Sequence, residues 1–332
     1  MLKVGLLGAG RIGKVHAKAI GRHPASTLVA VADAVSENAT ALATEYGCTV
    51  NSVDQIIADA AIDAVLIASP TDTHADLIEA ATEAGKAVFC EKPVDLSLDR
   101  AKACLAAIGS KSDSIMLGFN RRFDPGFSAL KASADAGEIG KAELLSITSY
   151  DPAPPPANYI QASGGLFRDM MIHDFDMANF IMGDIPLSIT AIGTSLVDPE
   201  IGKLGDVDTA VATLRYADGK ITVIQNSRRA VYGYDQRLEL LGSEGQLQIK
   251  NVLENTVVKS TADGVTGANP LHFFLERYMP AYEIEWAAFV DALVKKSKMP
   301  VTLRDGVVAL AMAEAATQSA ESGQPIDVQR IP

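Results

Sequence analysis

Two rhythms of apolar and polar residues divide the chain near residue 122. In the first part, short apolar runs alternate with segments whose apolar residues recur at helical spacing. The apolar runs cover residues 2–7, 28–32, 64–69, 87–90 and 114–118, and the helical segments cover residues 14–22, 37–46, 75–84 and 98–108. Alternating strands and helices are typical of a doubly wound Rossmann domain with a parallel sheet. We predict such an α/β domain over residues 1–122, with Ser97 capping its last helix and Asp72 or Thr73 its third.

The second part, residues 123–332, has longer runs in which apolar and polar residues alternate. Runs at 142–150, 188–197, 209–216 and 221–227 favour antiparallel strands. Asp218-Gly219 and the stretch from Gly242 to Gly245 predict hairpin turns. Helices are expected from Asp169 to Gly183 and over residues 281–296 and 304–322. The pattern predicts an α+β domain with a large, mainly antiparallel open sheet.

Composition narrows the class of protein. With 48% hydrophobic and 21% charged residues, the 332-residue chain has the makeup of an ordinary globular protein. Its net charge of -12 opposes binding to nucleic acid or to an anionic membrane, and no apolar run is long enough to span a bilayer. The three cysteines form no C-x-x-C site and no even disulfide set. We therefore expect a cytoplasmic protein with a small-molecule partner.

A glycine motif follows the first predicted strand. Gly8, Gly10 and Gly13 reproduce G-x-G-x-x-G around Arg11 and Ile12, at the start of a predicted helix. In this context the backbone amides and the helix dipole can bind the pyrophosphate of a dinucleotide. The alternative is a tight turn with no ligand.

Asp33 ends the second predicted strand, twenty residues beyond Gly13. A carboxylate at this distance can accept hydrogen bonds from the adenosine ribose, although it could instead cap a turn. No Lys or Arg occurs between Arg22 and Lys86, so a 2′-phosphate would meet Asp33 without a basic partner. NAD is therefore the predicted cofactor, with Arg11 as the one cation that could favour NADP.

Two more segments follow predicted strands and should reach the same sheet edge, where open parallel sheets bind ligands. Ser69, Pro70, Thr71 and His74 belong to the first segment and are predicted to contact the cofactor. Helix capping with a surface histidine is the alternative for that segment.

The second segment is Glu91-Lys92-Pro93. Because the proline keeps Lys92 out of helical geometry, its ammonium can be held in the crevice, and we predict a functional role. Glu91 is predicted to bind the cofactor. A surface lysine in a turn is the simpler alternative for Lys92.

Asp169 and His173 stand four residues apart within an apolar segment. On one helix they would share a face. The imidazole can then accept the proton of a hydroxyl group while the carboxylate orients it. A structural pair at a helix start is the alternative. A metal site that also used Asp174 and Asp176 is disfavoured, because the other histidines are scattered and no cysteine pair supports zinc; we predict no metal.

Taken together, these motifs resemble the glucose-fructose oxidoreductase/inositol dehydrogenase family over essentially the whole chain. The resemblance is carried by residues 8–13, 69–74, 91–93, 118–124 and 169–173, and its inositol-oxidising members are matched best at 120–124, 164–176 and 226–235. It implies an NAD-binding Rossmann domain, a C-terminal domain that binds substrate, and a homotetramer formed through the open sheets.

The resemblance also implies roles for side chains. Lys92 would hydrogen-bond the reacting hydroxyl, His173 would be the general base, and Asp169 would position the substrate or His173. The substrate wall would include Arg122, Asn158, Tyr159, Tyr232 and Tyr234. Arg122 could instead pair with Asp124, and Tyr232 and Tyr234 could simply pack on strand faces.

The expected reaction is NAD-dependent oxidation of myo-inositol to 2-keto-myo-inositol. Three alternatives stay open at this point: oxidation of scyllo- or D-chiro-inositol, oxidation of an aldose such as glucose, and a non-catalytic NAD-binding sensor.

Overall fold

A computed structural model describes residues 1–331, apart from the side chains of residues 158 and 161. The chain forms two compact units. Unit 1 contains Met1–Phe123, Pro280–Leu310 and Ile331, and unit 2 contains Asp124–Met279 and Ala311–Arg330. The first segment of unit 1 ends at Phe123, one residue beyond the domain boundary expected at residue 122. The compact units are nevertheless not contiguous halves, because residues 280–310 cluster with the N-terminal segment.

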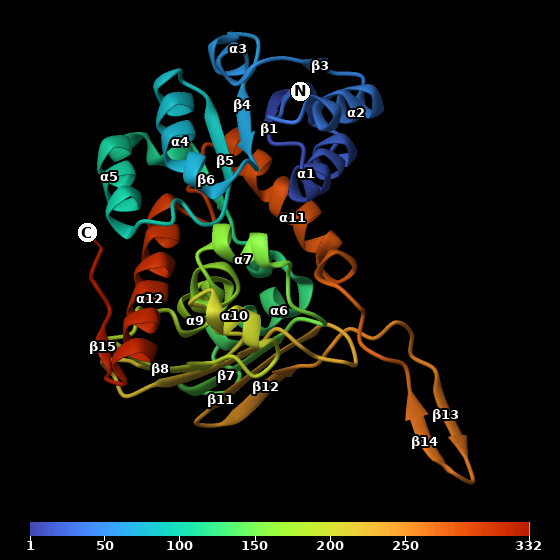
Figure 1. Ribbon diagram of the computed structural model, residues 1–332, viewed down its shortest axis with the longest axis vertical. Coiled ribbons are helices and arrows are strands. Elements are labelled where there is room, and N and C mark those ends of the chain that lie inside the picture. The colour runs from blue at the N-terminus through green and yellow to red at the C-terminus, as the bar shows by residue number, and fades with distance from the viewer. Residues whose placement is uncertain (332) are drawn as a thin grey trace. The chain divides into compact units, whose positions relative to one another are not determined.

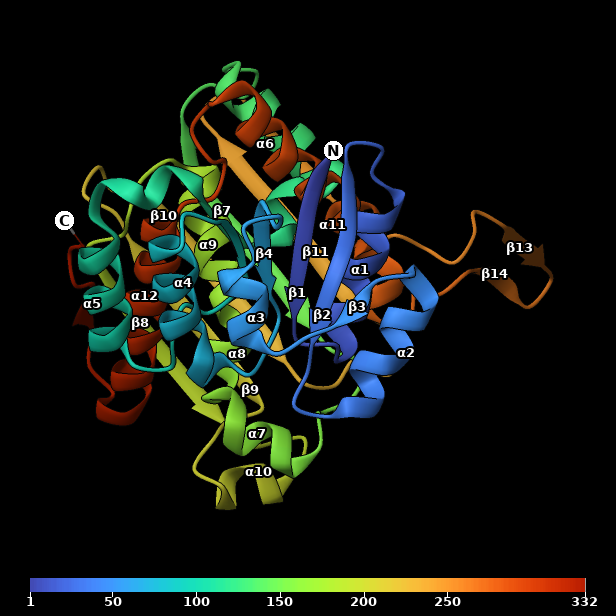
Figure 2. The same cartoon turned by 90° about the horizontal axis from the view of Figure 1, so that it is seen from above.

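Unit 1 is built on a six-stranded parallel sheet with the strand order β3-β2-β1-β4-β5-β6. The strands are β1 (Leu2–Leu7), β2 (Ser26–Ala32), β3 (Thr49–Val50), β4 (Ala64–Ile67), β5 (Ala87–Glu91) and β6 (Ile115–Gly118). In Figure 2, β1 lies beside β2. All four residues of β4 are fully buried, as expected for a strand covered on both faces. The strand order reverses between β1 and β4, which makes their carboxyl ends the expected ligand crevice.

The crossover helices of unit 1 match the sequence periodicity closely. They are α1 (Arg11–Arg22), α2 (Ser36–Tyr46), α3 (Val53–Ala58), α4 (His74–Glu83) and α5 (Leu98–Ile108). The Ser97 side chain caps α5 by accepting a hydrogen bond from the Arg100 amide, as predicted. Thr73 occupies the N-cap of α4, but its hydroxyl donates to the Pro70 carbonyl. The short elements β3 and α3 were not predicted, because neither spans enough residues to show a period.

Unit 2 contains a seven-stranded sheet with the order β12-β11-β7-β10-β9-β8-β15. Its strands are β7 (Ala142–Tyr150), β8 (Ser188–Thr194), β9 (Thr209–Arg215), β10 (Ile221–Ser227), β11 (Asp235–Gly242), β12 (Gly245–Ile249) and β15 (Ile326–Asp327). Both predicted hairpins, β9–β10 and β11–β12, are confirmed. Only the β7–β10 pair is parallel, so the sheet is mainly antiparallel as predicted.

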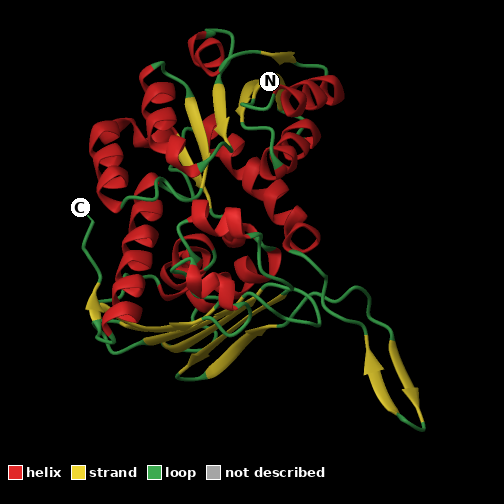
Figure 3. Cartoon of the chain, in the orientation of Figure 1, coloured by secondary structure: helices red, strands yellow, loops and turns green. Residues whose placement is uncertain are grey.

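The helices of unit 2 include α6 (Pro125–Asp135), α7 (Ala157–Ser163), α8 (Leu166–Asp169), α9 (Met171–Met182) and α10 (Pro199–Lys203). Helix α9 packs on β7 and β10, and Figure 3 shows the yellow sheet with helices of this unit on one side. The helix predicted to start near Asp169 and to end at Gly183 is found as α9, but a break at Met170 leaves Asp169 outside it. Asp169 ends α8, and α9 begins two residues later, after Met170. Gly183 ends α9 in the left-handed conformation, with φ 71°, as predicted.

Two long helices lie near the C-terminus, α11 (Phe274–Lys295) and α12 (Leu303–Ser322). Helix α11 begins earlier than predicted and contains Pro280. A hairpin of β13 (Val258–Thr261) and β14 (Gly264–Gly267), missed in the sequence, extends from unit 2 in orange in Figure 1. Within the described residues, no helix is both long and apolar enough to cross a membrane.

Candidate functional site

The glycine motif forms the turn between β1 and α1. A Cβ added to Gly8, which has φ 101°, would lie 2.4 Å from the Ala68 carbonyl oxygen, and one added to Gly13 would lie 2.0 Å from the Gly8 carbonyl oxygen. Packing of the protein itself therefore requires these two glycines. A Cβ at Gly10, the N-cap of α1, would meet nothing within 4 Å. Open space at the start of this helix is what close approach of a pyrophosphate needs.

Asp33 lies beside this turn. One carboxylate oxygen accepts a hydrogen bond from the Ala9 amide at 2.6 Å, and the other accepts one from the Val35 amide at 2.7 Å. The carboxylate thus braces the glycine turn after β2, which confirms the alternative that it caps a turn. Its contact with the ribose stays a prediction. Arg11, the first residue of α1, is exposed, whereas Ile12 is half-buried.

The segments after β4 and β5 are joined by His74. Its ring is buried, with Nδ1 2.7 Å from the Pro93 carbonyl oxygen and Nε2 2.9 Å from the Ser69 carbonyl oxygen. The alternative of a surface histidine is therefore wrong. Because both ring nitrogens face protein carbonyls, His74 holds the two loops together. Its contact with the cofactor stays a prediction.

Lys92 follows β5 and is half-buried. Its amide donates to Oε2 of Glu91 at 3.3 Å, and the Lys92–Pro93 bond is cis. The other carboxylate oxygen of Glu91 lies 2.6 Å from Nε2 of His16, a buried residue of α1. The sequence analysis missed His16, since a histidine three residues beyond the glycine motif has no distinguishing pattern.

In unit 2, Asp169 is held by two side chains. It accepts a hydrogen bond from the Tyr159 hydroxyl at 2.9 Å and forms an ion pair with Nη2 of Arg228 at 3.5 Å. The Arg228 side chain is only 2% exposed, so this ion pair is shielded from water. The sequence analysis gave Arg228 no role, because the preference of arginine for the surface does not reveal a buried ion pair.

His173 lies in the first turn of α9 and is half-buried. The argument that Asp169 and His173 share the face of one helix needs correction, because Met170 separates α8 from α9. The Asp169 amide closes α8 by donating to the Gly165 carbonyl oxygen, whereas the His173 amide lies 3.3 Å from the Met170 carbonyl oxygen. The two side chains are therefore presented by different helices joined at one residue.

The neighbouring carboxylates are structural. Asp174 is fully buried and accepts hydrogen bonds from the Ser149 hydroxyl at 2.6 Å and the Asn226 amide at 2.9 Å. These bonds fix the first turn of α9, which carries His173, to β7 and β10. Asp176 is also buried. Among the residues that the structure describes, no group of three or more His, Cys, Asp or Glu side chains is placed to hold a metal ion.

Arg122 lies in unit 1, where it donates to the Pro300 carbonyl oxygen at 3.3 Å and lies 3.7 Å from a carboxylate oxygen of Asp305. Asp124 instead caps α6 and pairs with Arg277. The alternative of an Arg122–Asp124 pair is therefore wrong.

Two of the three predicted wall tyrosines, Tyr232 and Tyr234, differ in burial. Tyr232 is 44% exposed and donates to Asp235 at 2.5 Å, and burial together with this bond raises the pKa of Tyr232 to about 12. It lines a hollow of about 460 Å³ on the sheet with Tyr150 and Gln225. Tyr234 is buried, and its ring packs edge-to-face with the Tyr278 ring, with 5.9 Å between the ring centroids. The side chain of Asn158 lies outside the described residues.

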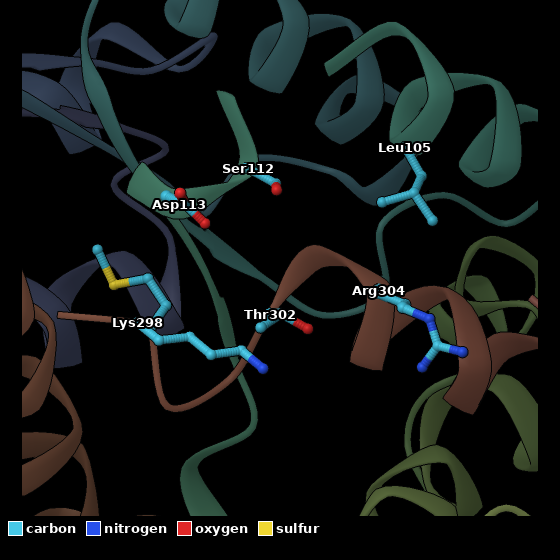
Figure 4. Close-up of a pocket in the computed structure, with 7 residues that line it drawn as sticks. Leu105, Ser112, Asp113, Lys298, Thr302 and Arg304 are labelled. Atoms are coloured by element: carbon cyan, nitrogen blue, oxygen red, sulfur yellow. The ribbon is translucent and has the colours of Figure 1, made fainter. Parts of the chain in front are cut away.

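A second hollow, of about 200 Å³, lies within unit 1 (Figure 4). Its lining residues come from α5, the segment before β6, the loop between α11 and α12, and the start of α12: Leu105, Ser112, Asp113, Lys298, Met299, Thr302 and Arg304. None of the predicted site residues lines this hollow. It therefore contributes nothing to the candidate site.

A parallel sheet in the order found here, with a glycine turn open at Gly10 and an acidic residue ending β2, defines a dinucleotide-dependent oxidoreductase. Comparison with known proteins agrees. Residues 2–119 match the model of an oxidoreductase family with an NAD-binding Rossmann fold, and residues 127–248 match the GFO/IDH/MocA C-terminal domain. The chain belongs to the GFO/IDH/MocA family, which confirms the resemblance seen in its motifs, and NAD is its cofactor.

Individual relatives cover the chain end to end. An inositol 2-dehydrogenase of Rhizobium meliloti is 50% identical over 328 residues, which span 98% of this chain and 99% of the relative. A crystal structure of a myo-inositol dehydrogenase from Corynebacterium glutamicum is 43% identical, with a TM-score of 0.96 and 99% of each chain covered. A scyllo-inositol dehydrogenase from Lactobacillus casei, solved with NAD(H) and scyllo-inositol, is 31% identical, with a TM-score of 0.92 and 99% of each chain covered.

Proposed function

We propose that this enzyme oxidises one secondary hydroxyl of an inositol, converting myo-inositol to 2-keto-myo-inositol. The observation that carries the proposal is an open glycine turn in a chain that also presents Asp169 and His173 and is 50% identical to an inositol 2-dehydrogenase. Oxidation removes two electrons and one proton from the carbon as hydride, and a second proton from the hydroxyl oxygen. NAD accepts the hydride when bound.

We propose that Gly8, Gly10, Gly13 and Asp33 hold the cofactor, with contributions from Arg11, Ile12, Ser69, Pro70, Thr71 and Glu91. Gly10 leaves room for the pyrophosphate at the start of α1. The Asp33 carboxylate accepts hydrogen bonds from the ribose while it braces the turn through the Ala9 amide. The same carboxylate would repel a 2′-phosphate, which supports NAD over NADP.

Three side chains handle the hydroxyl group in this proposal. His173 accepts the hydroxyl proton, Lys92 hydrogen-bonds the oxygen on which negative charge develops, and Asp169 orients the substrate or His173. Support comes from the family motifs that these residues match and from the shielded ion pair between Asp169 and Arg228, which holds the Asp169 side chain in place. The assignments of Arg122, Asn158, Tyr159, Tyr232 and Tyr234 to the substrate wall stay predictions.

The rival substrate is scyllo-inositol, because a relative with that activity superimposes on the chain with a TM-score of 0.92. The two inositols differ in the configuration of one hydroxyl, so discrimination depends on small differences in positioning. D-chiro-inositol and glucose remain the further candidates predicted from the sequence.

A polyol panel tests the proposal. Purified enzyme is given myo-, scyllo- or D-chiro-inositol or glucose with NAD or NADP, and NADH or NADPH formation is followed by absorbance. We expect the highest kcat/KM for myo-inositol with NAD. H173A should lower kcat by at least about a hundredfold, within the range that general base catalysis supplies, while leaving NAD affinity unchanged. Preference for another polyol would overturn the substrate, and NAD binding without any turnover would favour a sensor.

We also propose a homotetramer formed through the open face of the unit 2 sheet. Apolar side chains on this face are exposed in the single chain, including Ile192 at 73% and Val211 at 43%, which face each other on adjacent strands. Leu241, Leu144 and Ile221 form a second row across β11, β7 and β10. Exposed apolar side chains gathered on one face of a sheet favour an interface between chains. The cytoplasmic location predicted from the sequence stays a prediction.

A further inference from the structure

His16 has no part in the proposed function, yet it contacts the segment that carries Lys92. It lies on α1, fully buried, with Nε2 2.6 Å from Oε1 of Glu91. The imidazole also makes edge contacts with Phe89 at 5.1 Å and Tyr282 at 5.5 Å between ring centroids. The helix that begins at the glycine turn is thus joined to the end of β5 by a single buried polar contact.

The direction of this hydrogen bond follows from the other ring nitrogen. Nδ1 of His16 is buried and has no hydrogen-bond partner in the described chain. A proton on Nδ1 would be a buried donor without an acceptor, which is unfavourable. The ring proton therefore lies on Nε2 and is donated to the Glu91 carboxylate. A hydrogen bond to an ionised acceptor is stronger than one between neutral groups.

The Glu91 carboxylate is fixed from two further directions. Its second oxygen accepts the Lys92 amide at 3.3 Å. On the side of β6, a Cβ added to Gly118 would lie 3.1 to 3.2 Å from the carboxylate atoms, so a side chain there would displace Glu91. The carboxylate is therefore held by α1, packed against β6, and bonded to the backbone of the next residue.

We propose that His16 is a positioning residue for Lys92. By fixing the Glu91 carboxylate, His16 fixes the backbone from which the Lys92 side chain extends. This inference rests on the proposed role of Lys92 at the reacting hydroxyl. Misplacement of a reacting group by about 1 Å can lower a rate about a hundredfold. Loss of the hydrogen bond between His16 and Glu91 therefore slows the reaction although His16 does not contact the substrate.

The test uses paired variants of the full-length enzyme. H16F keeps an aromatic ring but has no donor, whereas H16Q keeps an N–H near the position of Nε2. We expect H16F to lower kcat at least about tenfold and to speed amide hydrogen exchange at Lys92. H16Q should restore most of the kcat and the exchange protection.

Ile20→Ala is the matched control. Ile20 is also fully buried on α1, so its truncation should lower Tm without changing kcat or exchange at Lys92. If H16F instead behaves like I20A, His16 is only a packing residue and the proposal is wrong. Unchanged exchange at Lys92 in H16F overturns it as well, whatever happens to kcat.

Two more variants separate this inference from the proposed function. If H16F does not fold, E91Q removes the charged acceptor and should give the same loss of kcat and of exchange protection. K92A tests the role on which the inference rests. Retained turnover in K92A would overturn the role of Lys92 and the positioning role together, whereas inactive K92A with fully active H16F and E91Q would overturn only the positioning role.

Discussion

The glycines of the β1–α1 turn have two different roles, because Gly8 and Gly13 are required for packing of the protein whereas Gly10 leaves space for the ligand. Gly8 and Gly13 have no room for a Cβ, because backbone oxygens of the protein would lie within 2.4 Å of it. Gly10 has room, with φ -70°, a value that any residue adopts. A motif that looks uniform in the sequence therefore contains two kinds of position.

This difference predicts opposite outcomes for two alanine substitutions. G13A should destabilise unit 1, because its Cβ would clash with the Gly8 carbonyl and force the turn open. G10A should keep the Tm of the unmodified enzyme but weaken NAD binding at least tenfold, or about 1.4 kcal/mol, because the methyl group would occupy the space left for pyrophosphate. Differential scanning calorimetry and titration calorimetry measure the two quantities. Unchanged NAD affinity in G10A would show that the pyrophosphate lies elsewhere.

Individual side chains also mark the limit of what the sequence could reveal. Gly8, Gly10, Gly13 and Asp33 were identifiable because their spacing follows from a single local geometry, the strand–turn–helix unit. Arg228 was not, because its partner Asp169 is 59 residues away and no local pattern links them. The contact of His16 with Glu91 joins residues 75 positions apart and could not be predicted for the same reason.

At the scale of elements, periodicity predicted those long enough to show it. Strand β7, helix α5 and the β9–β10 and β11–β12 hairpins lie where their patterns placed them. The break between α8 and α9 was not predictable, because Met170 is a good helix former and no proline or glycine marks the site. The fully exposed β13–β14 hairpin lacks a buried face, and hence lacks the alternation that identifies a strand.

Strand β11 begins with a buried carboxylate that joins the strand to the segments before β11 and after β12. Burial pushes the pKa of Asp235 upward, but hydrogen bonds from Arg237, Tyr232 and Asn251 outweigh it and hold the pKa below its usual range. A carboxyl group with a lowered pKa in the folded state stabilises the fold at pH values above its unfolded pKa, about 3.9. That contribution is lost as the pH falls through the folded pKa.

D235N should therefore show a stability loss that depends on pH. We expect the variant to be less stable than the unmodified protein by about 1 to 3 kcal/mol at pH 7, with the difference shrinking once the pH falls below about 4. Denaturant unfolding of both proteins between pH 3 and 7 measures this. E239Q, which changes an exposed carboxylate on the same strand, is the control and should have little effect. If the stability difference between D235N and the unmodified protein did not depend on pH, the shape of the Asp235 side chain, and not its charge, would account for its role.

The whole molecule raises the question of what covers the open face of the unit 2 sheet. Helix α9 packs against β7 and β10 on one face, whereas strand register brings Leu241, Leu144 and Ile221 into one row on the other. Because side chains alternate between the two faces of a strand, these exposed apolar residues lie together on one face of the sheet. Isologous packing of identical sheets would bury the same row on each partner.

Charge on this face should therefore change the size of the assembly. The double variant V211K/I221K places two ammonium groups where a second sheet would pack, and burying unpaired charges at such an interface is strongly unfavourable. We expect light scattering after size-exclusion chromatography to give a tetramer for the unmodified enzyme and a smaller species for the variant. V294K changes a 74%-exposed valine on the part of α11 that belongs to unit 1, and should stay tetrameric. If V211K/I221K is still a tetramer, the interface lies on another surface. If the unmodified enzyme is a monomer, the proposed tetramer is wrong.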